Sequence, residues 1–151
     1  MKSFIHCDRN SHFPPENFPF GVYEMNGEKS ICTALGDYVI DLKALESLGY
    51  FDEIMNKDGK LFSGVSLNHF MSLGRVISRA VRKLLQDLFA ESNPKLRDNP
   101  AHRNMCIIPA KRVKMVLPVD IIGYTDFYSS REHASNVGEM FRGKENALMP
   151  N

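Results

Sequence analysis

The segment at residues 22–42 restricts the fold more than any other part of this 151-residue chain. Its sequence, VYEMNGEKSICTALGDYVIDL, has β-prone runs separated by the turn dipeptides NG at 26–27 and GD at 36–37. Asn-Gly readily adopts the left-handed backbone of a two-residue hairpin turn, so the segment predicts two consecutive antiparallel hairpins. Short strands joined by tight turns favour a small barrel. The prolines of FPPENFPFGVY, at residues 13–23, predict an extended leader.

Helical signals follow the hairpins. Asp41 is placed to cap a short helix that runs through Leu48 and ends at Gly49. Ser66 is placed to cap one longer helix that continues to about Ala90. Within this longer segment, apolar side chains recur at the three-to-four spacing of one buried stripe. They are Val76, Ile77, Ala80, Val81, Leu84, Leu85, Leu88 and Phe89.

A break separates these helices from the rest of the chain. The prolines and polar residues of SNPKLRDNP, at residues 92–100, mark this break. The alternation in RVKMVLPV then predicts one strand over residues 113–117, closed by Pro118. The chain is therefore expected to be mainly β with helices, in the α+β class.

Composition excludes several classes of protein. The formal net charge of +1 gives no overall field that would attract a nucleic acid or a membrane. The longest apolar runs are too short to span a bilayer, and the N-terminus lacks the hydrophobic segment of a secretory signal. Cys7, Cys32 and Cys106 are widely spaced without a CxxC pair, which predicts free thiols in a cytoplasmic protein.

Two weaker patterns each have a simpler alternative. HCDRNSH, at residues 6–12, contains metal-ligand residue types but has no partner cluster, so a structural zinc site is disfavoured. Arg75, Arg79 and Arg82 lie on the side of the long helix opposite the apolar stripe. A nucleic-acid stripe would have this spacing, but acidic residues balance the chain, which favours a solvated face.

The segment YTDFYSSREHASNVGEMFR, at residues 124–142, concentrates the residue types of a reactive site. Ser129 and Glu132 fit the S-x-x-E capping box that begins a helix. His133 then falls in the first turn and is expected to face inward. The apolar residues on its side of the helix are Val137, Met140 and Phe141. A buried core histidine and a functional histidine have the same spacing, so the residues alone leave both open.

Asp126 and Tyr128 precede that helix. Because they are two positions apart in an extended segment, their side chains point to the same side. A carboxylate and a phenol aimed at one point ahead of a helix suit a site that holds a metal ion and an anionic substrate. The alternative is a local turn carboxylate and a core aromatic, and the residues alone do not decide between them.

The stretch YTDFYSSREHASNVGEMFRGKENALMPN, at residues 124–151, resembles the signature of the fumarylacetoacetase family. The resemblance extends to LNHFMSLG at 67–74, LGDYVIDL at 35–42 and FPPENFPFGVY at 13–23. It covers essentially the whole chain, which corresponds to the N-terminal portion of a family member.

This resemblance implies a fold and a reaction. The implied fold is a small SH3-like β-barrel with helices in residues 1–117, followed at 118–151 by the first strand and helix of a truncated β-roll catalytic domain. The implied reaction is hydrolysis of the carbon–carbon bond of 4-fumarylacetoacetate to fumarate and acetoacetate, in tyrosine and phenylalanine catabolism. The full-length protein is implied to be a cytoplasmic homodimer.

The resemblance also implies residue roles. Asp126 is implied to be a ligand of a calcium ion, with magnesium as the alternative, and His133 to be the general base that activates water. Tyr128 and Arg142 are implied to bind the substrate. General chemistry agrees, because a divalent ion on oxygen ligands polarises a diketone, a histidine takes the proton of water, and an arginine pairs with a carboxylate.

The chain departs from the family pattern in two places. The family usually reads I-G-D-Y-T-D, whereas here Ile122 and Gly123 directly precede Tyr124. The chain also ends at Asn151, before the family's remaining calcium ligands, the acid that pairs with the base, and a lysine. Because calcium takes about six to eight oxygens, the isolated chain is expected to be inactive. The alternative is a non-catalytic remnant or interaction module that keeps the barrel.

Overall fold

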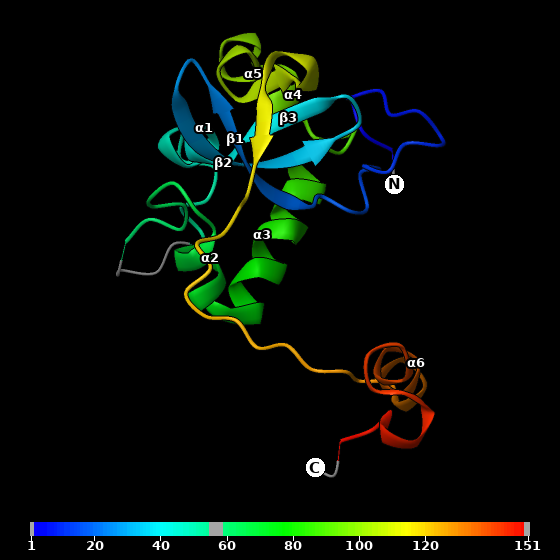
Figure 1. The fold of residues 1–151 in the computed structure, drawn as a ribbon. Helices are drawn as coiled ribbons and strands as arrows, with labels where there is room; N and C mark the ends of the chain where they lie inside the picture. The colour runs from blue at the N-terminus through cyan, green and yellow to red at the C-terminus, as the bar shows by residue number, and fades with distance from the viewer. Residues whose placement is uncertain (1, 55–58, 150–151) are drawn as a thin grey trace. The chain divides into compact units, whose positions relative to one another are not determined.

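The computed structural model of the chain describes residues 2–54 and 59–149. The chain divides into two compact units, Met1–Asp120 and Ile121–Asn151, which are described separately (Figure 1). The first unit contains the sheet and most of the helices, and the second contains α6 (Arg131–Arg142) and the 3-10 helix η2 (Lys144–Asn146). The domain boundary between residues 117 and 118, and the catalytic domain beyond it, stay predictions. No described helix has the length and apolar character needed to cross a membrane.

The two predicted hairpins are confirmed. They are formed by β1 (Phe20–Met25), β2 (Glu28–Leu35) and β3 (Tyr38–Asp41), which pair in antiparallel register. Each connection has two residues, and Asn26 and Gly27 of the first have φ of 54° and 82°. Both angles belong to the left-handed region that the hairpin turn requires. The turn residues therefore determine this part of the register.

Two short strands complete the sheet. They are β4 (Ile107–Pro109) and β5 (Lys114–Val116), and the strand order is β4-β3-β2-β1-β5 with every pairing antiparallel. The predicted strand at 113–117 is confirmed as β5, whereas β4 was not predicted. The α+β class is also confirmed. In the part of the chain that the structure describes, β4 and β5 are open edges that do not pair with each other, so the sheet does not close into a barrel.

Both faces of the sheet are buried. Alternation along the strands places Val22, Ile31 and Ile40 in the main core, where the helices cover them. Their neighbours Tyr23 and Cys32 point to the opposite face, into a smaller cluster that contains Val39. The central strands are therefore apolar on both sides, which explains why they lack the polar alternation of a solvent-facing sheet.

The first helix forms as predicted. In α1 (Leu42–Ser47), the cap is Asp41, whose Oδ1 accepts a hydrogen bond from the Ala44 amide at 2.9 Å. The other oxygen of Asp41 accepts from the Tyr23 hydroxyl at 2.5 Å. Gly49, with φ of 81°, takes the left-handed conformation just after the helix. One carboxylate thus ties the helix start to the second face of the sheet.

The single long helix predicted from Ser66 is wrong. The segment forms α2 (Asn68–Ser72) and α3 (Gly74–Leu88), and neither helix has a side-chain cap. The break lies at Gly74, whose φ of 83° is the left-handed conformation that interrupts a right-handed helix. The periodicity continues across the break, which explains why it did not reveal two helices.

The apolar stripe of α3 is buried only in its second half. Val81, Leu85 and Leu88 are buried, but Val76 is 80% exposed, so the stripe was predicted too long. On the opposite side, Arg75 and Arg79 are exposed, in line with a solvated face. Arg82 belongs to a different environment. Its guanidinium lies 5.1 Å from the centre of the Phe20 ring, and its Nε donates to the Asn17 carbonyl at 3.1 Å.

Residues 117–120 are tied to the start of α2. The Leu67 amide donates to the carbonyl of Pro118 at 2.8 Å. The Asn68 side chain donates to the Asp120 carbonyl at 2.9 Å and accepts from the Asp120 amide at 2.9 Å. This paired contact fixes the end of the first unit.

The break predicted at residues 92–100 contains the start of two short helices, α4 (Pro94–Arg97) and α5 (Pro100–Cys106). Each begins with an asparagine cap, Asn93 or Asn99, followed by a proline at the first helical position. Proline is favoured there because its missing N–H would have no helical partner. The segment that the sequence marks as a break therefore contains helix starts, because proline is compatible with the first helical position.

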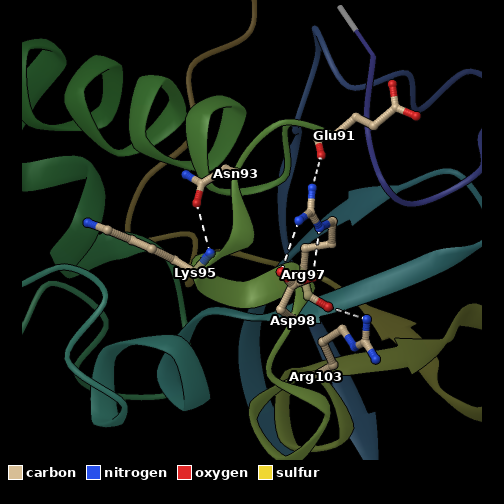
Figure 2. Close-up of polar contacts among 6 residues, drawn as sticks. All are labelled: Glu91, Asn93, Lys95, Arg97, Asp98 and Arg103. Carbon is tan, nitrogen blue, oxygen red and sulfur yellow. Dashed lines mark hydrogen bonds and ion pairs between the residues drawn. The ribbon is translucent and has the colours of Figure 1, made fainter.

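An arginine network holds these two helices (Figure 2). The Arg97 guanidinium bonds both carboxylate oxygens of Asp98, at 2.8 and 2.9 Å, and donates to the Glu91 carbonyl at 2.6 Å. The Arg103 guanidinium in turn donates to the Arg97 carbonyl. Arg97 and Arg103 hold the pKa of the Asp98 carboxyl below its usual range, chiefly through the Arg97 hydrogen bonds. The network thus joins the end of α4 to Glu91 and to α5.

The three cysteines are free thiols, as predicted. Burial, with a smaller contribution from the Asp41 carboxylate, raises the pKa of Cys32 and of Cys106 to about 12 from the ordinary 9.0. Burial also raises the pKa of Tyr23. All three groups therefore keep their protons to higher pH in the folded state than in the unfolded state.

We predict that the free energy of unfolding of the protein decreases at alkaline pH. A group whose pKa is raised by folding contributes stability that is complete below its unfolded pKa and is lost as pH rises through its folded pKa. The free energy of unfolding should therefore fall between about pH 9 and about pH 12, with Cys32 contributing at most about 1.4 kcal/mol per pH unit. Urea unfolding across this range measures the slope. Cys32→Ala should make it shallower, and an equal slope would contradict the assignment.

Candidate functional site

The four predicted site residues all lie in the second unit. Asp126 and Tyr128 belong to the segment between Leu117 and Ser130, in which every residue is described and no helix or strand forms. The first strand expected there is therefore absent. His133 and Arg142 lie on α6, at its first turn and its last residue. The site thus depends on an extended segment and one helix.

The predicted cap of α6 is displaced by one residue. The cap is Ser130, not Ser129, and its Oγ accepts from the His133 amide at 3.2 Å and donates to a Glu132 carboxylate oxygen at 3.0 Å. His133 is consequently the third helical residue, the position whose amide a cap oxygen can reach. Hydrogen bonds from its own backbone amide and from Ser130 lower the pKa of Glu132. The structural role predicted for Glu132 holds, with Ser130 as its partner.

His133 does not face inward. It is exposed. Of the three apolar residues predicted on its side of the helix, Val137 is half-buried, but Met140 and Phe141 are 74% and 80% exposed. Its ring contacts that of Tyr128 edge-on, with centroids 5.1 Å apart and an interplanar angle of 66°. Tyr128 is 56% exposed and is not a core aromatic. Neither ring is buried by the described residues of the second unit, and two predicted site residues lie in contact.

Asp126 stands apart from other metal-ligand side chains. It is exposed, and among the described residues no group of three or more His, Cys, Asp or Glu side chains converges on a point that would hold a metal ion. Calcium needs about six to eight oxygens. The described residues therefore do not fit a complete calcium site, because the carboxylate of Asp126 supplies at most two of these oxygens.

Arg142 contacts the backbone that follows α6. Its Nε donates to the Asn146 carbonyl at 3.0 Å, and its Nη2 donates to the Ala147 carbonyl at 2.8 Å. The structure thus assigns a definite position to the guanidinium, although no described contact joins it to His133 or Tyr128. The role of these two carbonyls was not predicted, because backbone atoms have no signature in a sequence.

The first unit has a hollow of about 930 Å³ that was not predicted from the sequence. Its rim holds Tyr50, whose hydroxyl is 2.8 Å from Nδ1 of His102, and Lys83, which forms an ion pair with Asp87 at 2.9 Å. Burial raises the pKa of the Tyr50 hydroxyl. These residues form two bonded pairs, and the lining of the hollow contains none of the four predicted site residues, so the second unit remains the candidate site.

Comparisons with known proteins agree with the family resemblance found in the sequence. Residues 16–118 match the family described as Fumarylacetoacetase N-terminal. The whole chain is 47% identical to the fumarylacetoacetase of Dictyostelium discoideum and 43% identical to that of Caenorhabditis elegans. Over 99% of its length it is 42% identical to the fumarylacetoacetase of Homo sapiens. The chain spans 36% of the length of each of these relatives.

Proposed function

The chain belongs to the fumarylacetoacetase N-terminal family, and from this premise we propose that it is the N-terminal part of an enzyme that hydrolyses 4-fumarylacetoacetate to fumarate and acetoacetate. The activity is proposed for a polypeptide of the relatives' length that contains this chain. The 151 residues alone are proposed to be inactive, because they span 36% of those relatives and do not complete a metal site.

The contact between Tyr128 and His133 carries this proposal. Hydrolysis of a carbon–carbon bond next to a ketone needs a base that removes a proton from water and donors that stabilise charge on the substrate oxygens. His133 is exposed at the start of α6 and meets the geometric need of a base that water can reach. Tyr128 places a phenol beside it, at 5.1 Å between ring centroids. Arg142 supplies a fixed guanidinium suited to a substrate carboxylate.

The metal ion is a separate part of the proposal. Asp126 is proposed to be one carboxylate ligand of Ca²⁺, with Mg²⁺ as the alternative, and the other ligands are proposed to come from outside this chain. The support is that Asp126 is an exposed carboxylate two residues before Tyr128. A hard divalent ion takes oxygen ligands of this kind and, when bound, supplies positive charge to a polarised carbonyl.

The finer fold and assembly are also proposed on the family's pattern. The five-stranded antiparallel sheet is proposed to be the SH3-like barrel in a form open between β4 and β5. Residues 118–151 are proposed to begin the β-roll catalytic domain. The full-length protein is proposed to be a cytoplasmic homodimer that acts on a small molecule and binds neither nucleic acid nor membrane. The large exposed fractions of Ile122, Tyr124 and Phe127, at 95%, 83% and 76%, support a second unit that packs against further protein.

We expect Asp126→Asn to weaken metal affinity in the polypeptide of the relatives' length. The calcium concentration that gives half-maximal hydrolysis should rise by at least roughly tenfold. Mutation of a residue that only hydrogen-bonds to a metal ligand already weakens metal binding by about that factor, and loss of a ligand's charge should cost no less. Saturating calcium should restore part of the rate, because the substitution removes charge but keeps an oxygen. The assay follows fumarylacetoacetate hydrolysis across a calcium titration.

The isolated 151-residue chain is the matching control and should show no turnover. Absence of turnover by the longer polypeptide at every calcium concentration would favour the non-catalytic module instead. Steady turnover by the isolated chain would contradict the incomplete metal site.

A further inference from the structure

The chain that follows α6 returns onto the helix at Gly138. Gly138 is buried within α6, and a Cβ built there would lie 1.7 Å from the carbonyl oxygen of Ala147 and 2.6 Å from its carbonyl carbon. Real atoms do not approach this closely, so any side chain at this position would displace the returning backbone. A glycine inside a helix weakens it relative to alanine. Gly138 therefore weakens α6 but allows the backbone of Ala147 to pack directly against the helix.

The same returning segment holds Arg142. Gly138 and Arg142 are four residues apart and therefore lie on one face of the helix. Gly143 has φ of 76°, and η2 then turns the chain so that the carbonyls of Asn146 and Ala147 accept from the guanidinium at 3.0 and 2.8 Å. We call residues 143–147 the strap. Because Gly138 has no side chain, it leaves a space on the helix surface, the notch, in which the strap lies. The Arg142 guanidinium donates hydrogen bonds to the carbonyls of the strap.

The strap uses one edge of the guanidinium and leaves another available. A guanidinium offers a carboxylate two parallel donors either along its Nε–Nη2 edge or along its Nη1–Nη2 edge. The two strap carbonyls occupy Nε and one hydrogen of Nη2. Within the described residues, Nη1 of Arg142 has no hydrogen bond in the structure. A carboxylate that binds with the strap in place therefore meets the Nη1–Nη2 edge.

We propose that the strap, seated in the notch at Gly138, positions Arg142 so that its Nη1–Nη2 edge receives the carboxylate of the substrate. This inference rests on the proposed function, which makes Arg142 a substrate-binding residue. Gly138 is a positioning residue in this arrangement, because it acts on the ligand only through the strap and Arg142. The strap limits the directions from which a carboxylate can approach, and it removes part of the side-chain entropy that a free arginine would lose on binding.

The first test measures the strap itself. In Gly138→Ala, the added Cβ would lie 1.7 Å from the Ala147 carbonyl oxygen and 2.7 Å from Nη2 of Arg142, so it should displace both groups and break the hydrogen bonds between Arg142 and the strap. The Nε–H of Arg142, followed by NMR in the 151-residue chain, should then exchange with water at least roughly tenfold faster than in the unaltered protein. The helical circular dichroism signal should not fall, because alanine favours a helix more than glycine does. This signal separates strap release from unfolding of α6.

Gly123→Ala is the matched control. Gly123 lies in the same unit, its φ is not left-handed, and a Cβ there would meet no atom within 4 Å. This variant should leave the exchange of the Arg142 Nε–H unchanged. Equal protection of that proton in Gly138→Ala and in the unaltered chain would overturn the strap.

The second test measures positioning in the polypeptide of the relatives' length. Gly138→Ala should raise KM for fumarylacetoacetate by roughly tenfold, the worth of one charged hydrogen bond, while kcat changes less than roughly threefold. Arg142→Lys keeps the charge but loses the planar pair of donors. Because both substitutions act on the same contact, the rise in KM for the double variant Gly138→Ala/Arg142→Lys should be smaller than the product of the two single rises. An unchanged KM in Gly138→Ala, with the strap released, would overturn the positioning role. Absence of activity in the unaltered enzyme would sink the proposed function, while the exchange measurement would still decide whether the strap exists.

Discussion

Phe89→Ala should lower the free energy of unfolding by about 3–5 kcal/mol, the usual cost of removing a buried phenylalanine. Phe89 is fully buried directly after α3. Its ring stacks on that of Phe4 at 5.4 Å between centroids, with the planes 9° apart, and lies 5.7 Å from that of Phe18. The substitution therefore leaves a cavity beside the two remaining rings, those of Phe4 and Phe18.

The position of Phe89 adds a second reason for a large effect. Its carbonyl accepts from the Phe4 amide at 3.2 Å, and its amide donates to the Leu85 carbonyl at 2.9 Å. The bridge between Ser3 and Ala90 continues this contact. Loss of the ring should thus loosen the N-terminal leader from α3 as well as empty the core, so that the two costs act on the same structural unit.

Urea denaturation of the 151-residue chain measures this effect, and Phe127→Ala is the matched control. Phe127 is 76% exposed, so its removal should change the free energy of unfolding by less than about 0.5 kcal/mol. A loss of under about 1 kcal/mol for Phe89→Ala would mean that the aromatic cluster relaxes to fill the space, and the packing argument would fail.

The hairpins were predictable because their signals are local. Asn26 and Gly27 require a conformation that few residues adopt, and the structure has them at φ of 54° and 82°. Asp41 likewise caps α1 through a contact with an amide three residues away. Such features depend on neighbours in the chain, so tertiary packing does not have to be known to predict them.

The division between α2 and α3 was less accessible. A glycine in an amphipathic segment is compatible with a continuous helix, and only its left-handed φ of 83° at Gly74 shows that the chain changes direction. Whether the sheet closes was also beyond local signals. Strand order depends on how β4 and β5 reach the edges of β3 and β1, and these pairings join residues far apart in the sequence.

The errors at the site have one physical cause. Spacing along α6 shows which side chains share a face, but it does not show which face other protein covers. His133, Met140 and Phe141 were therefore grouped correctly and assigned to the wrong environment, since all three are exposed. Contact of Tyr128 with His133 was within reach of the sequence, because both lie close to one helix start. The strap was not, because it depends on backbone carbonyls.

His133→Asn should lower kcat in the polypeptide of the relatives' length by roughly two to four orders of magnitude, the usual worth of a positioned general base. Asparagine has a similar size and polarity but cannot accept a proton at neutral pH. The fold should change little, because the His133 side chain is exposed and the cap uses only its backbone amide, which donates to Ser130 Oγ at 3.2 Å. The loss should therefore appear in the chemical step and not in stability.

The control for this prediction is another exposed histidine. His12→Asn, in the leader, should leave kcat within about twofold, because His12 is an exposed histidine to which the proposed mechanism gives no part in the chemical step. Circular dichroism and urea unfolding of both variants establish that they are folded before rates are compared. Because the 5.1 Å ring contact links His133 to Tyr128, Tyr128→Phe should keep that contact while removing only the phenol hydroxyl. A kcat for His133→Asn equal to that of the unaltered enzyme would exclude the imidazole as the base, and the ring pair would then serve only to orient the helix start.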